Sequence, residues 1–293
     1  MSELLALDVA TGSFQALASG APDAPLVLVL HGFPDAPPTF ETLLDELAGR
    51  GFRAVAPWAR GYAPSVLDGP YDVETLAADV LALCDVLAPD GAPVYLLGHD
   101  WGAAVTYTAC ALAPARFGAA VALAVPHPLA FLRALSRSRQ ALRSWYMFFF
   151  QVPGAERLAA ARDFALIDRL WRTWSPGLAL PAASRAEVHA CLRASWPAPL
   201  LYYRAMFRPF GEAMRRLRPS TGIARRLTVP LLYLHGADDG CIAPAAASGA
   251  ERYFAGPYRS EIVEGAGHFL AAECPDEIAT RAASWFGVHA RPH

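Results

Sequence analysis

The chain has 293 residues, of which 54% are hydrophobic, and a formal net charge of −2, which suits one large α/β domain with a sizeable core. No apolar run approaches the roughly 18 residues that a membrane span needs, so no membrane partner is expected. The five cysteines are scattered without C-x-x-C spacing, and no basic stretch precedes an apolar one at the N-terminus. These features predict a cytoplasmic protein without disulfides.

The basic residues are unusual in kind and in distribution. All 25 are arginines, and the absence of lysine and asparagine excludes mechanisms that need either side chain. The segment from Pro128 to Arg218 carries 15 arginines and five acidic residues. Nucleic-acid binding is one interpretation of such a segment, but no nucleic-acid motif accompanies it. We therefore expect a solvated basic surface and no nucleic-acid partner, while an anionic substrate stays open.

Short apolar runs alternate with helical patterns along most of the chain. In chain order, strands that lead into turns are expected over residues 24–34, 52–62, 93–102, 119–128, 229–240 and 258–269, and helices over 41–51, 72–88, 103–113 and 275–286. This alternation predicts an α/β fold, with a mostly parallel sheet flanked by helices.

Residues 129–218 break this pattern, because they are rich in Arg, Trp, Tyr and Phe and look helical throughout. The sequence thus predicts a core in two parts, 1–128 and 219–293, separated by an inserted helical cap, 129–218. Ligands of parallel α/β sheets bind at the carboxyl ends of the strands, so an insertion after a strand end would cover that site.

The sequence GHDWG, residues 98–102, follows a predicted strand and precedes a predicted helix, which is the setting of a nucleophile elbow. Its central residue is Asp100. A serine that attacked saturated carbon would form an ether, whereas a carboxylate forms an ester that water can cleave at the enzyme's own carbonyl carbon. Asp100 therefore indicates an epoxide or alkyl halide substrate, although an ordinary turn with a capping aspartate has a similar pattern.

A second half-reaction needs a base that activates water and an acid that orients the base. His268 lies in a glycine-flanked loop after the last predicted strand, and Asp238 and Asp239 follow the strand before it. The order nucleophile, acid, histidine is that of α/β-hydrolases. No acidic residue occurs between Trp101 and Ala155, so the strand before the insertion offers no rival acid.

The sequence HGFP, residues 31–34, ends the first predicted buried strand. The backbone N–H of Phe33 could donate to an oxyanion, and the N–H of Trp101, directly after the nucleophile, could supply the second donor.

Taken together and in this order, the motifs resemble the α/β-hydrolase fold and, within it, the epoxide hydrolases. The matching pieces are HGFP at 31–34, RGY at 60–62, GHDWG at 98–102, GADDG at 236–240, GAGH at 265–268 and two cap stretches. The resemblance spans about residues 4 to 286 and implies an eight-stranded sheet. It implies Asp100 as nucleophile, His268 as base and Asp239, the last position of G-x-x-D, as orienting acid. It also implies a cis peptide bond before Pro34.

Epoxide hydrolases also use two cap tyrosines that hydrogen-bond the epoxide oxygen and supply a proton. The stretch WYMFFFQVPG places one at Tyr146, and LLYYRAM offers Tyr203, with Tyr202 as its alternative. Tyrosines in aromatic-rich helices also serve in packing alone. Three further residues are expected to line the substrate pocket: His31, Pro34 and Trp145.

The resemblance implies that a small-molecule epoxide and water give a vicinal diol without any cofactor or metal, and it leaves a homodimer open. A haloalkane dehalogenase is the first alternative. Many of these enzymes bind the leaving halide with an Asn in place of Phe33, and this chain has no asparagine. Others bind it with a second tryptophan from the cap, for which Trp145, Trp171 and Trp174 are candidates. A fluoroacetate dehalogenase would have Arg in place of Trp101. The second alternative is a non-catalytic small-molecule receptor of the same fold.

Overall fold

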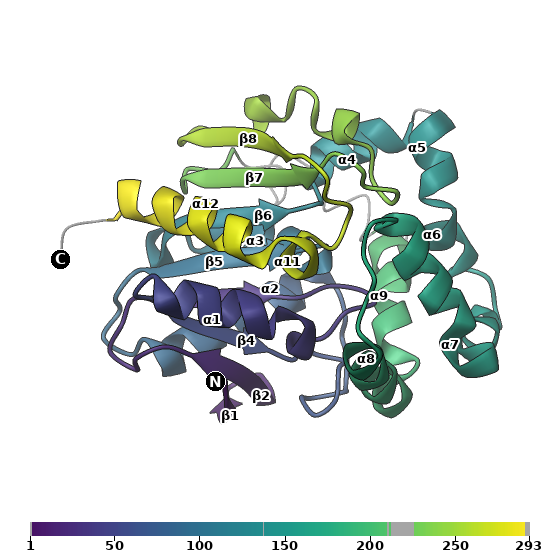
Figure 1. Cartoon of the computed structure of the whole chain (residues 1–293), viewed down its shortest axis with the longest axis horizontal. Coiled ribbons are helices and arrows are strands. Elements are labelled where there is room, and N and C mark those ends of the chain that lie inside the picture. Colours follow the sequence, from purple (N-terminus) through teal and green to yellow (C-terminus); the bar gives the residue numbers. More distant parts are fainter. Residues whose placement is uncertain (1, 137, 210, 212–225, 291–293) are drawn as a thin grey trace.

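A computed structural model describes residues 2–136, 138–209, 211 and 226–290, and its centre is an eight-stranded sheet (Figure 1). The strands are β1 (Glu3–Val9), β2 (Gly12–Ser19), β3 (Leu26–Leu30), β4 (Arg53–Pro57), β5 (Val94–His99), β6 (Phe117–Leu123), β7 (Leu231–Gly236) and β8 (Tyr258–Val263). Their order in the sheet is β1-β2-β4-β3-β5-β6-β7-β8. From β4 to β8 all neighbours pair in parallel, whereas β2 is antiparallel to both β1 and β4. The predicted mostly parallel sheet is confirmed.

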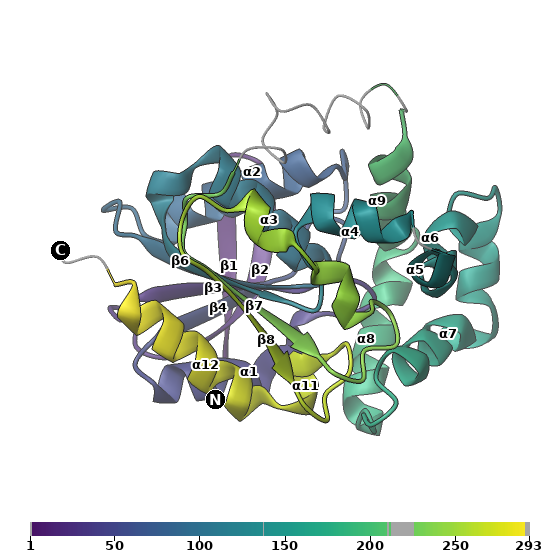
Figure 2. The same ribbon diagram turned by 90° about the horizontal axis from the view of Figure 1, so that it is seen from above.

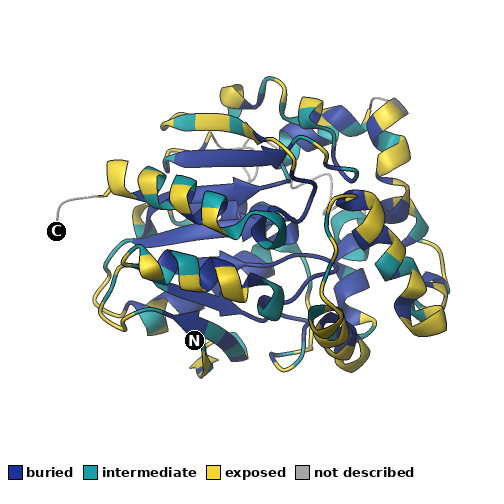
Figure 3. Ribbon diagram, viewed as in Figure 1, coloured by how far each residue is buried: buried dark blue, intermediate teal, exposed yellow. Residues whose placement is uncertain are grey.

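Helices cover both faces of the sheet. They are α1 (Glu41–Gly49), α11 (Leu270–Glu273) and α12 (Pro275–Val288) on one face, and α2 (Val73–Leu87) and α3 (Trp101–Leu112) on the other (Figure 2). Each face has its own buried apolar cluster. The central strands are buried along their whole length and the outer faces of the helices are exposed, as Figure 3 shows. This double cover explains why the central strands are continuous apolar runs rather than alternating ones.

The described residues of the segment between β6 and β7 are mainly helical and contain no strand. Its helices are α4 (Pro128–Leu135), α5 (Ser138–Arg143), α6 (Trp145–Phe149), α7 (Ala155–Trp174), α8 (Ala182–Ser195) and α9 (Ala198–Phe207). Non-helical backbone angles interrupt α7 at residues 161–164. Helices α6 to α9 stand beyond the carboxyl ends of the parallel strands (Figures 1 and 2). The predicted cap boundary at residue 218 lies outside the described residues.

Short 3-10 helices complete the described chain: η1 (Pro37–Phe40), η2 (Pro114–Arg116), η4 (Pro244–Ala247) and η5 (Ala250–Tyr253). All five cysteines are free thiols, as the scattered spacing predicts. Within the described part of the chain, no helix has both the length and the apolar character needed to cross a membrane.

Candidate active site

Asp100 occupies the sharp turn between β5 and α3, with φ 52° and ψ −115°. This conformation is rare for a residue with a side chain, and it is the strained geometry of a nucleophile elbow. The turn also demands small neighbours: a Cβ at Gly98 would lie 2.2 Å from the carbonyl oxygen of Gly102, and one at Gly102 would lie 2.0 Å from that of Leu30. The positions two residues before and after Asp100 are thus glycines, because backbone atoms fill the space that a side chain would need.

One carboxylate oxygen of Asp100 is already held by the loop after β3. The backbone N–H of Phe33 donates to Oδ1 of Asp100 at 2.8 Å. A Cβ at Gly32 would lie 2.4 Å from the same Oδ1 and 2.5 Å from the backbone nitrogen of Trp101. The HGFP loop therefore lies directly against this oxygen and the start of α3. The peptide bond between Phe33 and Pro34 is cis, as the resemblance implies.

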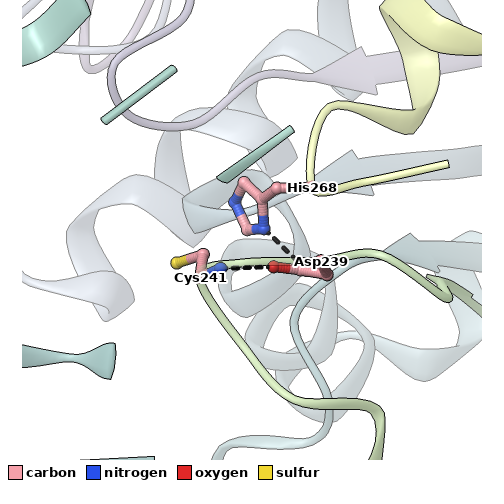
Figure 4. Close-up of side chains that lie close together, drawn as sticks. All are labelled: Asp239, Cys241 and His268. Atoms are coloured by element: carbon pink, nitrogen blue, oxygen red, sulfur yellow. Dashed lines mark hydrogen bonds and ion pairs between the residues drawn. The ribbon is translucent and has the colours of Figure 1, made fainter. Parts of the chain in front are cut away.

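The loops after β7 and β8 bring Asp239 and His268 to the nucleophile. His268 Nδ1 donates to Asp239 Oδ2 at 2.9 Å, and His268 Nε2 lies 3.6 Å from Asp100 Oδ2. Figure 4 shows the imidazole facing the Asp239 carboxylate. All three side chains are buried. The sequence left two acids open, and the geometry separates them, because Asp238 is exposed and Asp239 is bonded to the histidine.

Asp239 is stabilised as an anion from two sides. Its Oδ1 accepts from the backbone N–H groups of Cys241 at 2.7 Å and Ile242 at 2.8 Å. Burial opposes the charge, but His268 and these donors prevail and hold the pKa of Asp239 below its usual value. Burial likewise opposes an imidazolium, yet Asp239 and Asp100 together raise the pKa of His268 to about 10. The histidine is therefore held between two carboxylates.

Tyr146 on α6 and Tyr203 on α9 meet over the nucleophile, with their ring centroids 5.6 Å apart. The Tyr203 hydroxyl is buried and has no hydrogen-bond partner among the described residues, whereas the Tyr146 hydroxyl bonds to Cys241 Sγ at 3.3 Å. Burial raises the pKa of both phenols well above the usual value, so both keep their protons. Tyr202, the alternative to Tyr203, instead donates to the backbone carbonyl of Arg60.

Asp100, Tyr146 and Tyr203 share one cavity of about 330 Å³, a size that suits a small ligand. The cavity lies between α4, α6 and α9 of the insertion and α3 of the core. Its apolar lining comprises Val125, Pro128, Phe131, Leu132, Met147, Met206, Phe207 and Ile242, among others. This lining could not be read from the sequence, because the contributing helices are distant in the chain and show no common pattern.

His31 lies outside this cavity, contrary to the expectation for the substrate pocket. Its Nδ1 donates to the carbonyl oxygen of Gly32 at 3.1 Å, and its Nε2 accepts from the backbone N–H of Ala59 at 3.0 Å. Burial lowers the pKa of His31 to about 4, so the ring is neutral. Nδ1 thus orients the ring within the HGFP loop, and Nε2 joins this loop to the one at Ala59.

Pro34 and Trp145 are likewise not among the residues that line the cavity. Pro34 is buried in the HGFP loop, and the Trp145 side chain is 42% exposed on α6, where it packs against Phe149. The pocket prediction is corrected at these positions: Tyr146, the next residue on α6, points inward, and Trp145 points outward.

Asp239, Cys241 and His268 also place three potential metal-ligand atoms within 4.8 Å of one another (Figure 4). The fit to a metal is poor, because Asp239 and His268 already bond to each other. Burial raises the pKa of the Cys241 thiol well above its usual value, whereas a thiol must lose its proton to bind a metal. Cys241 carries no motif that could have marked it as part of the site.

Known proteins resemble this chain in both sequence and fold. The α/β hydrolase family matches residues 26–281. The chain is 30% identical to epoxide hydrolase A of Mycobacterium tuberculosis over 89% of each chain. It is 32% identical to epoxide hydrolase 3 of Xenopus tropicalis over 90% of this chain and 72% of that protein. The crystal structure of epoxide hydrolase A from Mycobacterium thermoresistibile is similar with a TM-score of 0.80 and 25% identity, covering 97% of this chain and 98% of the other.

Proposed function

This chain belongs to the α/β-hydrolase family and, within it, to the epoxide hydrolases, and on that premise we propose that it converts an epoxide to a vicinal diol through a covalent ester on Asp100. The observation that carries this mechanism is the position of Asp100 between three kinds of group. The Phe33 N–H holds one of its oxygens, His268 faces the other, and the unpartnered Tyr203 hydroxyl lies in the same cavity.

The two oxygens of Asp100 have different roles in the first step. Oδ1 is held by the Phe33 N–H, so Oδ2 is the oxygen that attacks a ring carbon. The C–O bond of the epoxide breaks as the bond from Oδ2 to carbon forms, and the electron pair goes to the epoxide oxygen. The hydroxyls of Tyr146 and Tyr203 both donate hydrogen bonds to that oxygen, and one of them gives it a proton as the ring opens. The tyrosinate that results takes a proton from the His268 imidazolium through solvent, which leaves His268 neutral.

Water completes the reaction at the ester carbonyl carbon. His268 Nε2 takes a proton from water, which attacks Cγ of Asp100. The charge that develops on Oδ1 is stabilised by the N–H groups of Phe33 and Trp101. The bond from Cγ to Oδ2 then breaks, the diol leaves with Oδ2, which takes the second proton of the water, and Asp100 keeps the oxygen from water as a carboxylate. No step requires a metal or an organic cofactor.

The charges at the site fit this sequence of events. While Asp100 is an anion, it and Asp239 hold the pKa of His268 near 10. Ester formation removes the Asp100 charge and therefore one of the causes of that raised pKa. His268 thus becomes able to act as a base at the stage where a base is needed.

The other two candidate functions have less support. A haloalkane dehalogenase of the kind that uses a second cap tryptophan needs it beside the leaving halide, but Trp101 is the one tryptophan among the described residues that line the cavity. A receptor that only binds its ligand needs no aligned nucleophile, base and acid, whereas here His268 bonds to Asp239 and faces Asp100. These contacts favour turnover of an epoxide.

The test is to trap the ester. With His268→Gln, the first step remains possible but the base is gone, so incubation with styrene oxide should add the mass of one styrene oxide to the intact protein. A digest should locate that mass on the peptide with Asp100. Asp100→Asn should show neither the added mass nor diol, and Asp238→Asn serves as the matched control with activity unchanged. Diol formation that survives Asp100→Asn, or halide release from a bromoalkane without any diol from epoxides, would show that the mechanism is wrong.

A further inference from the structure

Helices α3, α4, α6 and α9 contribute residues to the lining of the cavity that contains Asp100. The part between α4 and α9 has Phe131 and Met206 among its lining residues. A substituent on the ring carbon that points this way has mostly apolar side chains around it.

Four aromatic side chains that do not line the cavity pack against Tyr203 and His268, and we call them the closed side: Phe33, Phe150, Trp174 and Phe269. Phe33 and Phe150 lie edge to face at 5.5 Å, and Trp174 lies 5.1 Å from the His268 ring. All four are buried, and none lines the cavity. Aromatic side chains packed at interior density leave no room there for a second large substituent.

Backbone contacts fix the closed side as well. The carbonyl oxygen of Trp174, at the end of α7, accepts from the N–H of Gly240 at 3.0 Å and from that of His268 at 3.1 Å. Ser175 Oγ, the next residue, accepts from the N–H of Phe269 at 2.9 Å. The end of α7 is therefore bonded to both loops that carry the catalytic acid and histidine, and small movements of side chains cannot open this side.

The charge of the cavity is also uneven. Among the described residues that line it, the only ionisable groups besides tyrosines are Asp72 and Asp100, and no arginine is included. A carboxylate on the substrate would lose its hydration in this largely apolar cavity, close to the Asp100 carboxylate, and the described lining offers no arginine to pair with it. The basic composition of the insertion thus does not extend to the described wall of the cavity.

From these observations, and resting on the function proposed above, we propose that the substrate is an uncharged epoxide with one bulky apolar substituent, carried on one ring carbon only. The substituent fills the cavity between α4 and α9. The other ring carbon, which faces the closed side, carries hydrogen or a methyl group at most.

The experiment measures kcat/KM for the wild-type chain on a matched series of epoxides. Styrene oxide and trans-β-methylstyrene oxide should be hydrolysed at similar efficiency, whereas trans-stilbene oxide, with a phenyl group on each carbon, should be on the order of 100-fold worse. For charge, 4-carboxystyrene oxide should be about 10-fold or more below its methyl ester, because the ester has the same shape without the buried charge. Equal efficiency on stilbene oxide and styrene oxide would overturn the shape inference, and a preference for the carboxylate would overturn the charge inference.

Variants test the closed side directly. Phe150→Ala opens room there and should raise the kcat/KM ratio of stilbene oxide to styrene oxide about 10-fold. Leu158→Ala, exposed on α7, is the control and should leave the ratio unchanged. Phe131→Trp fills the open direction and should lower kcat/KM for styrene oxide about 10-fold, and this second variant decides the matter if Phe150→Ala does not fold. A ratio unmoved by folded Phe150→Ala, or full activity in Phe131→Trp, contradicts the inference.

The experiment distinguishes a wrong function from a wrong substrate class. If no epoxide of the series is converted to diol, the proposed function itself is wrong, and this inference falls with it. If stilbene oxide is hydrolysed as well as styrene oxide and Asp100→Asn abolishes both activities, the function stands and only the substrate class is wrong.

Discussion

The hydroxyl of Tyr146 and the thiol of Cys241 lie 3.3 Å apart and are both buried, although 95 positions separate them in the chain. This contact joins the cap helix α6 to the loop that carries Asp239. It also distinguishes the two cap tyrosines, because the hydroxyl of Tyr203 has no such partner among the described residues. Cys241 therefore positions the hydroxyl that is expected to meet the epoxide oxygen.

Replacing Cys241 tests this positioning role. Cys241→Ala removes the partner of Tyr146, and the rate of ester formation should fall about 3- to 10-fold, the size of one neutral hydrogen bond. Ester hydrolysis should change less, since Tyr146 acts in the first step. Stopped-flow tryptophan fluorescence separates the two steps. Cys241→Ser restores a hydroxyl partner and should recover most of the rate; a loss as large as that of Cys241→Ala would refute positioning through the hydrogen bond.

The two cap tyrosines should share the protonation of the epoxide oxygen. Tyr146→Phe and Tyr203→Phe should each slow ester formation by about 10- to 100-fold, and the double variant should lose more, because a general acid contributes about 100-fold or more. Tyr202→Phe is the control. It loses a bond to the carbonyl of Arg60 and should affect stability more than ester formation. Pre-steady-state burst rates with styrene oxide give the comparison.

A matched pair of variants, Asp239→Asn and Asp238→Asn, tests which of these two residues is the acid that orients His268. Asp239→Asn keeps the shape but removes the charge that orients and stabilises the imidazolium, so ester hydrolysis should slow about 100- to 10,000-fold. Asp238→Asn changes an exposed side chain and should remain within twofold of the wild-type rate. Single-turnover decay of the alkyl-enzyme, followed by intact mass, measures this step; similar rates in the two variants would reject the assignment.

Ser175 links the end of α7 to the histidine loop. Its hydroxyl accepts from the N–H of Phe269 at 2.9 Å and donates to Glu273 at 2.7 Å. Ser175→Ala leaves the Phe269 N–H without its partner, and the free energy of unfolding should fall by about 1–3 kcal/mol. Urea denaturation measures the change. Ser136→Ala, whose hydroxyl donates to a carbonyl on the surface, should cost less than about 0.5 kcal/mol.

Stability should depend on pH through His268. Its pKa rises from 6.5 to about 10 on folding because of Asp239 and Asp100, despite the opposing effect of burial. A group whose folded pKa is raised stabilises the fold fully below its unfolded pKa, and this contribution is lost as the pH rises through 10. The free energy of unfolding should thus fall by a few kcal/mol, on the order of 1.4 per unit of pKa shift, between pH 6.5 and 10. His268→Gln should flatten that slope in urea titrations, and since the chain has no lysine, no lysine titration overlaps this window.

The parts of the site that the sequence predicts are those whose geometry is set locally. The elbow at Asp100 depends on a strand, a helix and two glycines within five residues, so the motif and the structure agree. The parallel sheet was predictable for a similar reason, because buried strands are continuous apolar runs. The antiparallel β1–β2 hairpin was not, since β1 is largely exposed and therefore does not form a buried apolar run.

The rest depends on how distant segments pack. No pattern in the insertion shows that Trp145 points outward while Tyr146 points inward. Consecutive residues of a helix point in different directions, and α6, with only five residues, is too short to show a periodic pattern. His31 looked like a pocket residue because of its motif, but its two ring nitrogens bond to backbone that no motif identifies. Cys241 and the closed side are likewise visible only once α7 and α6 are placed over the core.

The bonds from the end of α7 to the acid and histidine loops also bear on how molecules enter and leave. In the binding mode proposed above, an epoxide and its diol occupy the same cavity between α4 and α9. The diol must depart before another epoxide can arrive, so the two compete for one cavity. Added diol should therefore inhibit competitively, and changes near Phe131 should alter product release together with substrate entry.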